Sequence, residues 1–146
     1  MVSSTVKPIT RAAVQAGVLA CTSRVNQISK FLTANTQSAA VLSFAPNEPD
    51  QHIFSASLEI IPPGIPSLYA STSFTPTPGG GCDAVYDTVQ FMPEACADVV
   101  TDRFKVTGTP AVIKKNILIL NAGTVRFFLM PAGSKGCIVI KKEVVQ

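Results

Sequence analysis

Four cysteines are the residues with the most chemistry to offer in this sequence: Cys21, Cys82, Cys96 and Cys137. Cysteines that hold a structural zinc ion usually occur as closely spaced pairs, often together with histidines. No such pair is present, and the single histidine, His52, lies in a different segment. We therefore expect no metal and no other cofactor. Two disulfide bonds are the more economical use of the four cysteines, and they favour an oxidising, exported location.

Spacing favours one pairing of these cysteines over the others. Cys82 and Cys96 would bracket a short helical excursion, whereas Cys21 and Cys137 would join the two ends of the chain. In the chain-entropy model the short closure stabilises the fold by ~3 kcal/mol, and the long one by a little under ~5 kcal/mol. Four cysteines allow three pairings, so the connectivity stays open. The alternative is four reduced thiols that pack as small hydrophobic side chains.

His52 is the one side chain that could activate a cysteine or serine nucleophile. It begins a strand after a polar turn, and no Gly-x-Ser-x-Gly elbow supports it. The acidic residues between Asp83 and Asp102 resemble the solvated side of a helical excursion more than two carboxylates facing each other across a cleft. We expect no catalytic residue, and we keep a small hydrolase that uses His52 as an alternative.

Anion binding receives little support from the glycines and lysines. Gly79-Gly80-Gly81 is followed by Cys82-Asp83, which places a negative charge where a phosphate would lie. Lys114-Lys115 and Lys141-Lys142 are two small basic pairs without an arginine fork or a run of exposed aromatic residues. This footprint argues against nucleic acid as a partner.

Aromatic residues flank the Pro/Gly-rich segment 75–81, which is the one place where such side chains and a flexible loop coincide. Loops on rigid scaffolds often carry recognition. We expect a protein or small-molecule partner, if one binds, to contact the stretch 73–91. The alternative is that the aromatic side chains fill the core beneath the loop. They are Tyr69, Phe74, Tyr86 and Phe91.

The elements that position these residues belong to a chain of 146 residues, of which 47% are apolar and 14% charged, with a net charge of +3. This composition excludes a disordered chain, and the length predicts a single domain over 1–146 with the 75–81 loop inside it. No stretch of the sequence is apolar enough to span a membrane. We leave open whether the protein is a monomer or a homodimer.

One amphipathic helix is predicted over 10–33. Its apolar residues recur at spacings of three and four, Gly17 is its weak point, and Asn35 is a plausible left-handed stop. The stretch that ends in Val18-Leu19-Ala20-Cys21 loosely resembles a lipoprotein box. However, the apolar run before it is interrupted, so we expect no signal peptide in the first 20 residues.

Alternation predicts strands over 39–44, 52–60 and 67–74, followed by helices over 82–91 and 94–100. A closing meander is predicted over 103–106, 111–120, 125–130 and 137–145, with an Asn-Ala-Gly hairpin turn at 121–123 and a lysine-bearing edge strand at the end. The fold class is α+β: an N-terminal amphipathic helix packed on a mostly antiparallel sheet of about six or seven strands, with a short helical insertion.

These features predict a small periplasmic or secreted, non-enzymatic binding module stabilised by two disulfides. The alternative is an inhibitor or immunity-type protein that blocks a partner enzyme with the same stretch, 73–91. Architecture alone does not select between these functions.

Overall fold

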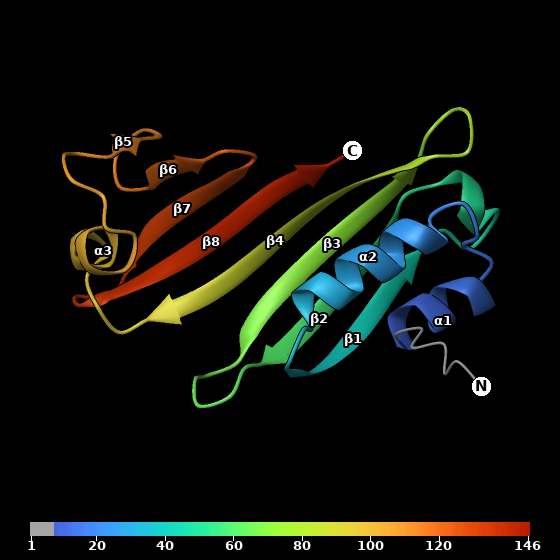
Figure 1. The fold of residues 1–146 in the computed structure, drawn as a ribbon, viewed down its shortest axis with the longest axis horizontal. Coiled ribbons are helices and arrows are strands. Elements are labelled where there is room, and N and C mark those ends of the chain that lie inside the picture. Colours follow the sequence, from blue (N-terminus) through green and yellow to red (C-terminus); the bar gives the residue numbers. More distant parts are fainter. Residues whose placement is uncertain (1–7) are drawn as a thin grey trace. The chain divides into compact units, whose positions relative to one another are not determined.

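A computed structural model describes residues 8–146 (Figure 1). The fold combines helices with one antiparallel sheet in the order β1-β2-β3-β4-β8-β7-β6-β5. This confirms the α+β class, although the sheet has eight strands instead of six or seven. The elements are α1 (Pro8–Gln15), α2 (Thr22–Leu32), β1 (Gln37–Phe44), η1 (Pro49–Gln51), β2 (Phe54–Ile61), β3 (Leu68–Pro76), β4 (Cys82–Met92), α3 (Cys96–Asp98), η2 (Val99–Arg103), β5 (Ala111–Val112), β6 (Leu118–Ala122), β7 (Val125–Ala132) and β8 (Gly136–Val145).

The chain forms two compact units, which are described separately. The first unit contains the residues up to Tyr86 together with Val144–Gln146, and the second contains Asp87–Glu143. The division falls within β4 and β8 and not at the 75–81 loop. The single domain expected from the length stays a prediction.

The helix predicted over 10–33 is wrong in one respect, because it breaks into α1 and α2. Gly17 adopts a φ of 94°, and the amides of Gly17 and Val18 donate to the carbonyls of Val14 and Ala13 at 3.0 Å each. These two bonds form a Schellman motif, which closes a helix at a left-handed glycine, and Ala13 and Val18 are both buried beside it. The predicted left-handed stop at Asn35 is confirmed by a φ of 57°.

The first three strands follow the predicted alternation. β1 pairs with β2 from Gln37 opposite Ile61 to Phe44 opposite Phe54, and β2 pairs with β3 in turn. One face of these strands is buried beneath α1 and α2, which pack against each other and against β1 and β3. The core of the first unit is built from alternate strand residues and the helix stripe: Ala13, Val18, Val25, Ile28, Phe54, Ala56, Leu58, Ile60, Ala70, Phe74 and Tyr86.

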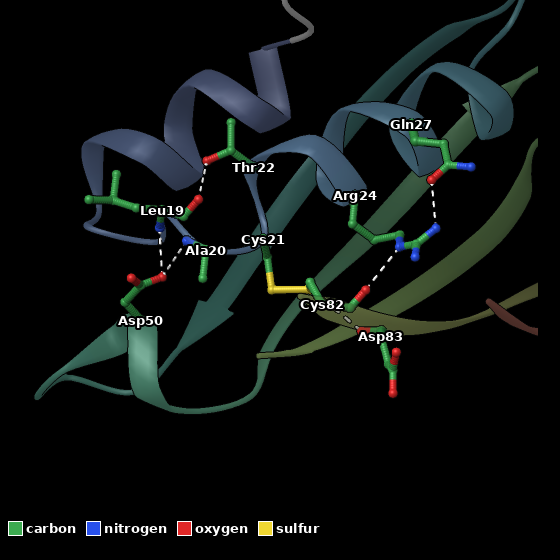
Figure 2. The surroundings of a disulfide bond; sticks show 9 residues. All are labelled: Leu19, Ala20, Cys21, Thr22, Arg24, Gln27, Asp50, Cys82 and Asp83. Atoms are coloured by element: carbon green, nitrogen blue, oxygen red, sulfur yellow. Dashed lines mark hydrogen bonds between the residues drawn. A yellow bond between two sulfur atoms is a disulfide. The ribbon is translucent and has the colours of Figure 1, made fainter. Parts of the chain in front are cut away.

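A disulfide between Cys21 and Cys82 joins the start of α2 to the start of β4 (Figure 2). Arg24 reinforces the same junction, since its Nε donates to the carbonyl of Cys82 at 2.9 Å. Asp50 holds the loop before α2, because its Oδ1 accepts hydrogen bonds from the backbone amides of Leu19 and Ala20 at 2.7 and 2.8 Å. Three separate segments therefore meet around the first turn of α2.

The helix predicted over 82–91 is wrong, because this segment is the eleven-residue strand β4. Val85 and Val89 have helical spacing, but the segment is also rich in β-branched and aromatic residues, which suit a pleated strand. Cys82, Ala84 and Tyr86 alternate with less buried neighbours in the observed strand. Asp83 and Asp87 consequently lie on a strand and not on a solvated helix.

The second unit packs a short helical segment, α3 followed by the wide turn η2, against strands β6 to β8. The predicted short helix over 94–100 is therefore confirmed in part. Buried side chains from this segment meet alternate residues of the strands, and Phe104 lies edge-on to Phe127 with ring centroids 4.7 Å apart. The core of the second unit consists of Cys96, Val99, Val100, Leu120, Leu129, Cys137 and Val139.

The preferred cysteine pairing is wrong, because the second disulfide joins Cys96 to Cys137. The reason is the extended β4, in which eleven residues at ~3.3 Å each carry the chain away from Cys82. A disulfide requires Cα atoms within ~7 Å. Cys96 instead lies in α3 against the start of β8, and the alternative of four reduced thiols is also wrong.

The closing meander differs from prediction in four places. Residues 103–106 form no strand, and the run 111–120 divides into β5 and β6 around a turn in which the Ile113 amide donates to the Ile117 carbonyl at 2.9 Å. β8 is not an edge strand, because it lies between β4 and β7, and Lys142 pairs there with Asp87 at 3.0 Å. The predicted hairpin between β6 and β7 is confirmed, but its turn is at 123–124 and not 121–123, because Asn121 and Ala122 pair with Arg126 and Val125.

Within residues 8–146, no helix is long and apolar enough to span a membrane. The sequence expectation about a signal peptide falls partly on residues 1–7, which lie outside the described residues.

Candidate functional site

β1 is the outermost strand of the first unit, and its sequence is unprotected. Among the described residues it pairs with β2 alone. Its eight residues, Gln-Ser-Ala-Ala-Val-Leu-Ser-Phe, include no charge, proline or glycine. Proteins usually protect a sheet edge with short strands, lysines, prolines or bulges. β1 has none of these sequence features and is the right length to pair with a further strand.

β5, at the other end of the strand order, illustrates a protected edge. It is only two residues long, and Lys114 and Lys115 follow it closely in the chain. Short length and nearby lysines both discourage additional pairing. The two ends of the strand order therefore differ in their capacity to accept a partner.

A pocket of about 410 Å³ lies between α1 and β1. The helix α1 packs mainly against α2 and touches β1 less extensively, which leaves space between α1 and β1. The sheet side is contributed by residues of β1 such as Ala40 and Leu42, and the helix side by Ile9 and Ala12. Among residues 8–146, no ionisable residue lines the pocket. The lining is Pro8, Ile9, Ala12, Thr33, Thr36, Ser38, Ala39, Ala40 and Leu42.

The edge and the pocket suit strand addition. In this mode the backbone of an extended peptide pairs with a free strand, and its alternate side chains enter pockets beside that strand. β1 supplies the backbone groups, and the pocket beside it supplies space for small apolar side chains. The arrangement thus combines free backbone pairing groups with a neighbouring pocket.

The structure separates the four aromatic residues predicted to contact a partner. Phe74 and Tyr86 are buried in the first unit, where Phe74 stacks on Phe54 at a centroid distance of 5.5 Å. Tyr69 is exposed, and its hydroxyl donates to Ser57 Oγ at 3.2 Å. Phe91 is exposed in the second unit. Partner binding by the stretch 73–91 stays a prediction.

The glycines of the 75–81 loop form the turn between β3 and β4. The Thr77 amide donates to the Gly81 carbonyl at 2.9 Å, and a Cβ on Gly81 would lie 2.7 Å from Thr77 Oγ1. The turn is thus tightly closed at its base. A polar hollow of about 360 Å³ lies beside it, between this turn and the start of α2, with Arg24 among its lining residues.

His52 follows η1 and is exposed at the start of the β2 region. The four cysteines, which were the candidate nucleophiles and ligands, are all joined in disulfides. Over residues 8–146 no group of three or more histidine, cysteine or acidic residues could hold a metal ion.

One pair of ionisable groups has clearly displaced pKa values. Arg103 donates through Nε and Nη2 to both carboxylate oxygens of Glu94, at 3.1 and 2.6 Å. These hydrogen bonds, with the attraction between the charges, lower the pKa of Glu94 and raise that of Arg103. Both groups are near the surface, and the pair joins the residues just before α3 to the end of η2.

Sequence reasoning missed the β1 edge. The strand itself was predicted, but its position at the end of the sheet depends on pairing between distant segments. The absence of charge from Gln37 to Phe44 was the available signal, but it does not identify an edge, because an interior strand can share it.

Comparisons with known proteins find no family model that matches the chain, and no significant match to a curated protein or a solved structure.

Proposed function

We propose that this protein is an exported, non-enzymatic binding module that holds an extended peptide segment as an additional strand on β1. The observation that carries the proposal is the combination of an uncharged free edge with an apolar pocket beside it. Two disulfides built from buried cysteines support export, because such bonds persist in oxidising compartments.

The lining of the pocket indicates the chemistry of the peptide. A charged side chain that entered this pocket would lose water without gaining an ionic partner from the lining. The segment should therefore have small apolar side chains at alternate positions and no charge over the paired stretch. If the segment belongs to an enzyme, the module would act as the inhibitor or immunity-type protein considered from the sequence.

Selection from a displayed library of random octapeptides tests this proposal on the intact, oxidised protein. We expect enriched peptides to alternate small apolar residues, to lack charges and to lack internal proline. Ala12→Leu should abolish their binding, because the larger side chain fills the pocket from α1. Val14→Leu is the matched control on the same helix, since Val14 is exposed and does not line the pocket.

A second variant separates the edge from the loop predicted by the sequence. Val41→Lys places a charge on β1 at a side chain that is 71% exposed, so the fold should tolerate it while strand addition weakens. Deleting 76–80 should leave peptide binding unchanged. Enrichment of charged peptides, or peptides that bind Ala12→Leu normally and lose binding on the loop deletion, would overturn the proposal.

Export is tested separately by mass measurement after alkylation of the native protein. We expect no alkylated cysteine without reductant and four with it. Four reactive thiols in protein isolated from its source without reductant would contradict an exported location.

A further inference from the structure

The open face of the second unit is apolar, and its side chains on β6, β7 and β8 are half-buried. In β6, β7 and β8 the residues that alternate with the buried core side chains point to the opposite face of the strands. The register places Ile119 beside Phe128, Phe128 beside Ile140, and Met130 beside Ile138. The helical segment packs on the other face, so these apolar side chains are covered by no helix of the second unit.

Phe91 extends this apolar face onto β4. A Cβ on Gly136 would lie only 2.6 Å from the Phe91 ring, which shows that the ring rests against the backbone at the start of β8. Phe91 is 56% exposed even in this position. The face is therefore continuous across four strands, and it ends on an exposed aromatic side chain.

Basic residues surround the apolar face, and most acidic residues of the unit do not. Arg126 and Lys142 are paired in register at one end of the β7–β8 ladder, where Lys142 also contacts Asp87. Exposed lysines lie in the turns at the other end, at positions 114, 115 and 135. Glu94, Asp98 and Asp102 belong to the helical segment on the opposite face.

The second unit carries all of the net positive charge of the chain. Residues 87–143 contain eight basic and five acidic side chains, a net charge of +3, which equals that of the whole chain. The remaining residues contain four of each sign. An apolar centre with a basic rim is complementary to an anionic lipid surface, where acyl chains meet headgroups.

We propose that the open face of the second unit docks on an anionic lipid surface. Ile119, Phe128, Met130, Ile138, Ile140 and Phe91 contact the acyl boundary, and the lysines at the turns contact the headgroups. Nucleic acid fits the basic rim, but four of these six side chains are isoleucine or methionine, which offer little for bases to stack on. This proposal is independent of peptide binding at β1.

Sedimentation with lipid vesicles tests the proposal on the full, oxidised chain. We expect binding to vesicles of phosphatidylcholine mixed equally with phosphatidylglycerol, and little binding to phosphatidylcholine alone. Replacing Lys114, Lys115 and Lys135 by Gln should weaken the affinity about fivefold for each lysine removed. Lys30→Gln, a charge change on α2, should leave the affinity unchanged.

A second variant tests the apolar centre. Phe128→Thr with Ile140→Thr should abolish vesicle binding, whereas Ile65→Thr at an exposed position of the first unit should not change it; circular dichroism verifies that each variant is folded. Equal binding to both vesicle types, or none to either, would overturn the proposal. It would also fail if the double variant converted a dimer to a monomer, since a second copy would then cover the face, or if an oligonucleotide bound tightly and independently of Phe128 and Ile140.

Discussion

The two units bury one face of their strands beneath helical segments but differ on the opposite face. In the first unit that face is rich in serine: Ser43 is paired with Ser55 and Ser55 with Ser73, and Ser57 is paired with Ser71. In the second unit the corresponding alternation places isoleucine, phenylalanine and methionine outward. Small hydroxyl side chains are stable in contact with water, whereas a continuous apolar face marks an interaction surface.

The two proposals assign different roles to the units. In them, the first unit offers a strand edge and a pocket to a peptide, and its serine-rich face also carries the exposed Val41 and Tyr69. The second unit offers a face with surrounding positive charge. Unfolding measurements on matched variants test whether the units, which differ in surface, also differ in the interactions that stabilise them.

Removal of either disulfide should have the largest effect. Cys21 and Cys82 are 61 residues apart, and Cys96 and Cys137 are 41 apart. The chain-entropy model gives each closure about 4 kcal/mol, because the cost depends only on the logarithm of loop length. We expect Cys21→Ala/Cys82→Ala and Cys96→Ala/Cys137→Ala to lower the free energy of unfolding in urea by similar amounts. A much larger loss for one pair would show that one unit depends on its disulfide more than loop length explains.

Truncation of a core leucine in each unit should have the next largest effect on the free energy of unfolding. Leu58 and Leu129 are both fully buried, one in each unit. Leu58→Ala and Leu129→Ala should each cost about 3 kcal/mol through lost burial and the cavity left behind. The expectation of one domain requires both substitutions to shift the same unfolding transition, observed by circular dichroism and by fluorescence of the two tyrosines. Two transitions, each shifted by only one substitution, would divide the chain into separate domains.

Local alternation predicted much of the first unit and less of the second. The strands from β1 to β3 combine one buried face with one polar face, so the period of two is visible in the sequence. In the second unit Ile119 and Phe128 are as apolar as their buried neighbours, and periodicity could not identify which face receives the helix. The open apolar face was therefore not predicted.

The cysteine pairing and the strand order could not be read from local patterns. The interval from Val85 to Val89 fits both a helix and a strand, and choosing the helix made Cys82–Cys96 the natural short closure. The position of β8 between β4 and β7 depends on pairing across long separations, so its lysines gave a false indication of an edge. Gly17 was recognised as a weak point, but the left-handed conformation that ends the helix there was not predicted.

Two glycines provide a smaller test of local geometry in each unit. Gly136→Ala should cost about 2 kcal/mol, because its Cβ would lie 2.6 Å from Phe91 and 2.7 Å from the Ala132 carbonyl. Gly17→Ala should cost about 1 kcal/mol from its left-handed conformation, with a 3.3 Å contact to Pro49 that the proline ring can relieve. Gly123→Ala is the control, since it shares the positive φ but has open space around it. Urea unfolding measures all three, and a cost near zero for Gly136, whose φ is not positive, would show that the Phe91 contact is readily relieved.

The Glu94–Arg103 pair should give the smallest effect, and it should depend on pH. The hydrogen bonds from Arg103 lower the pKa of Glu94 in the folded protein below its ordinary value of 4.5. A carboxyl group with a lowered folded pKa contributes stability above its unfolded pKa and loses that contribution as the pH falls through the folded value. Glu94→Gln should therefore lower the thermal midpoint slightly at neutral pH and leave it unchanged once the pH is below the folded pKa. Exposed Glu59→Gln in the first unit is the matched control; a pH-independent loss for Glu94→Gln would show that the amide disturbs packing and not the ion pair.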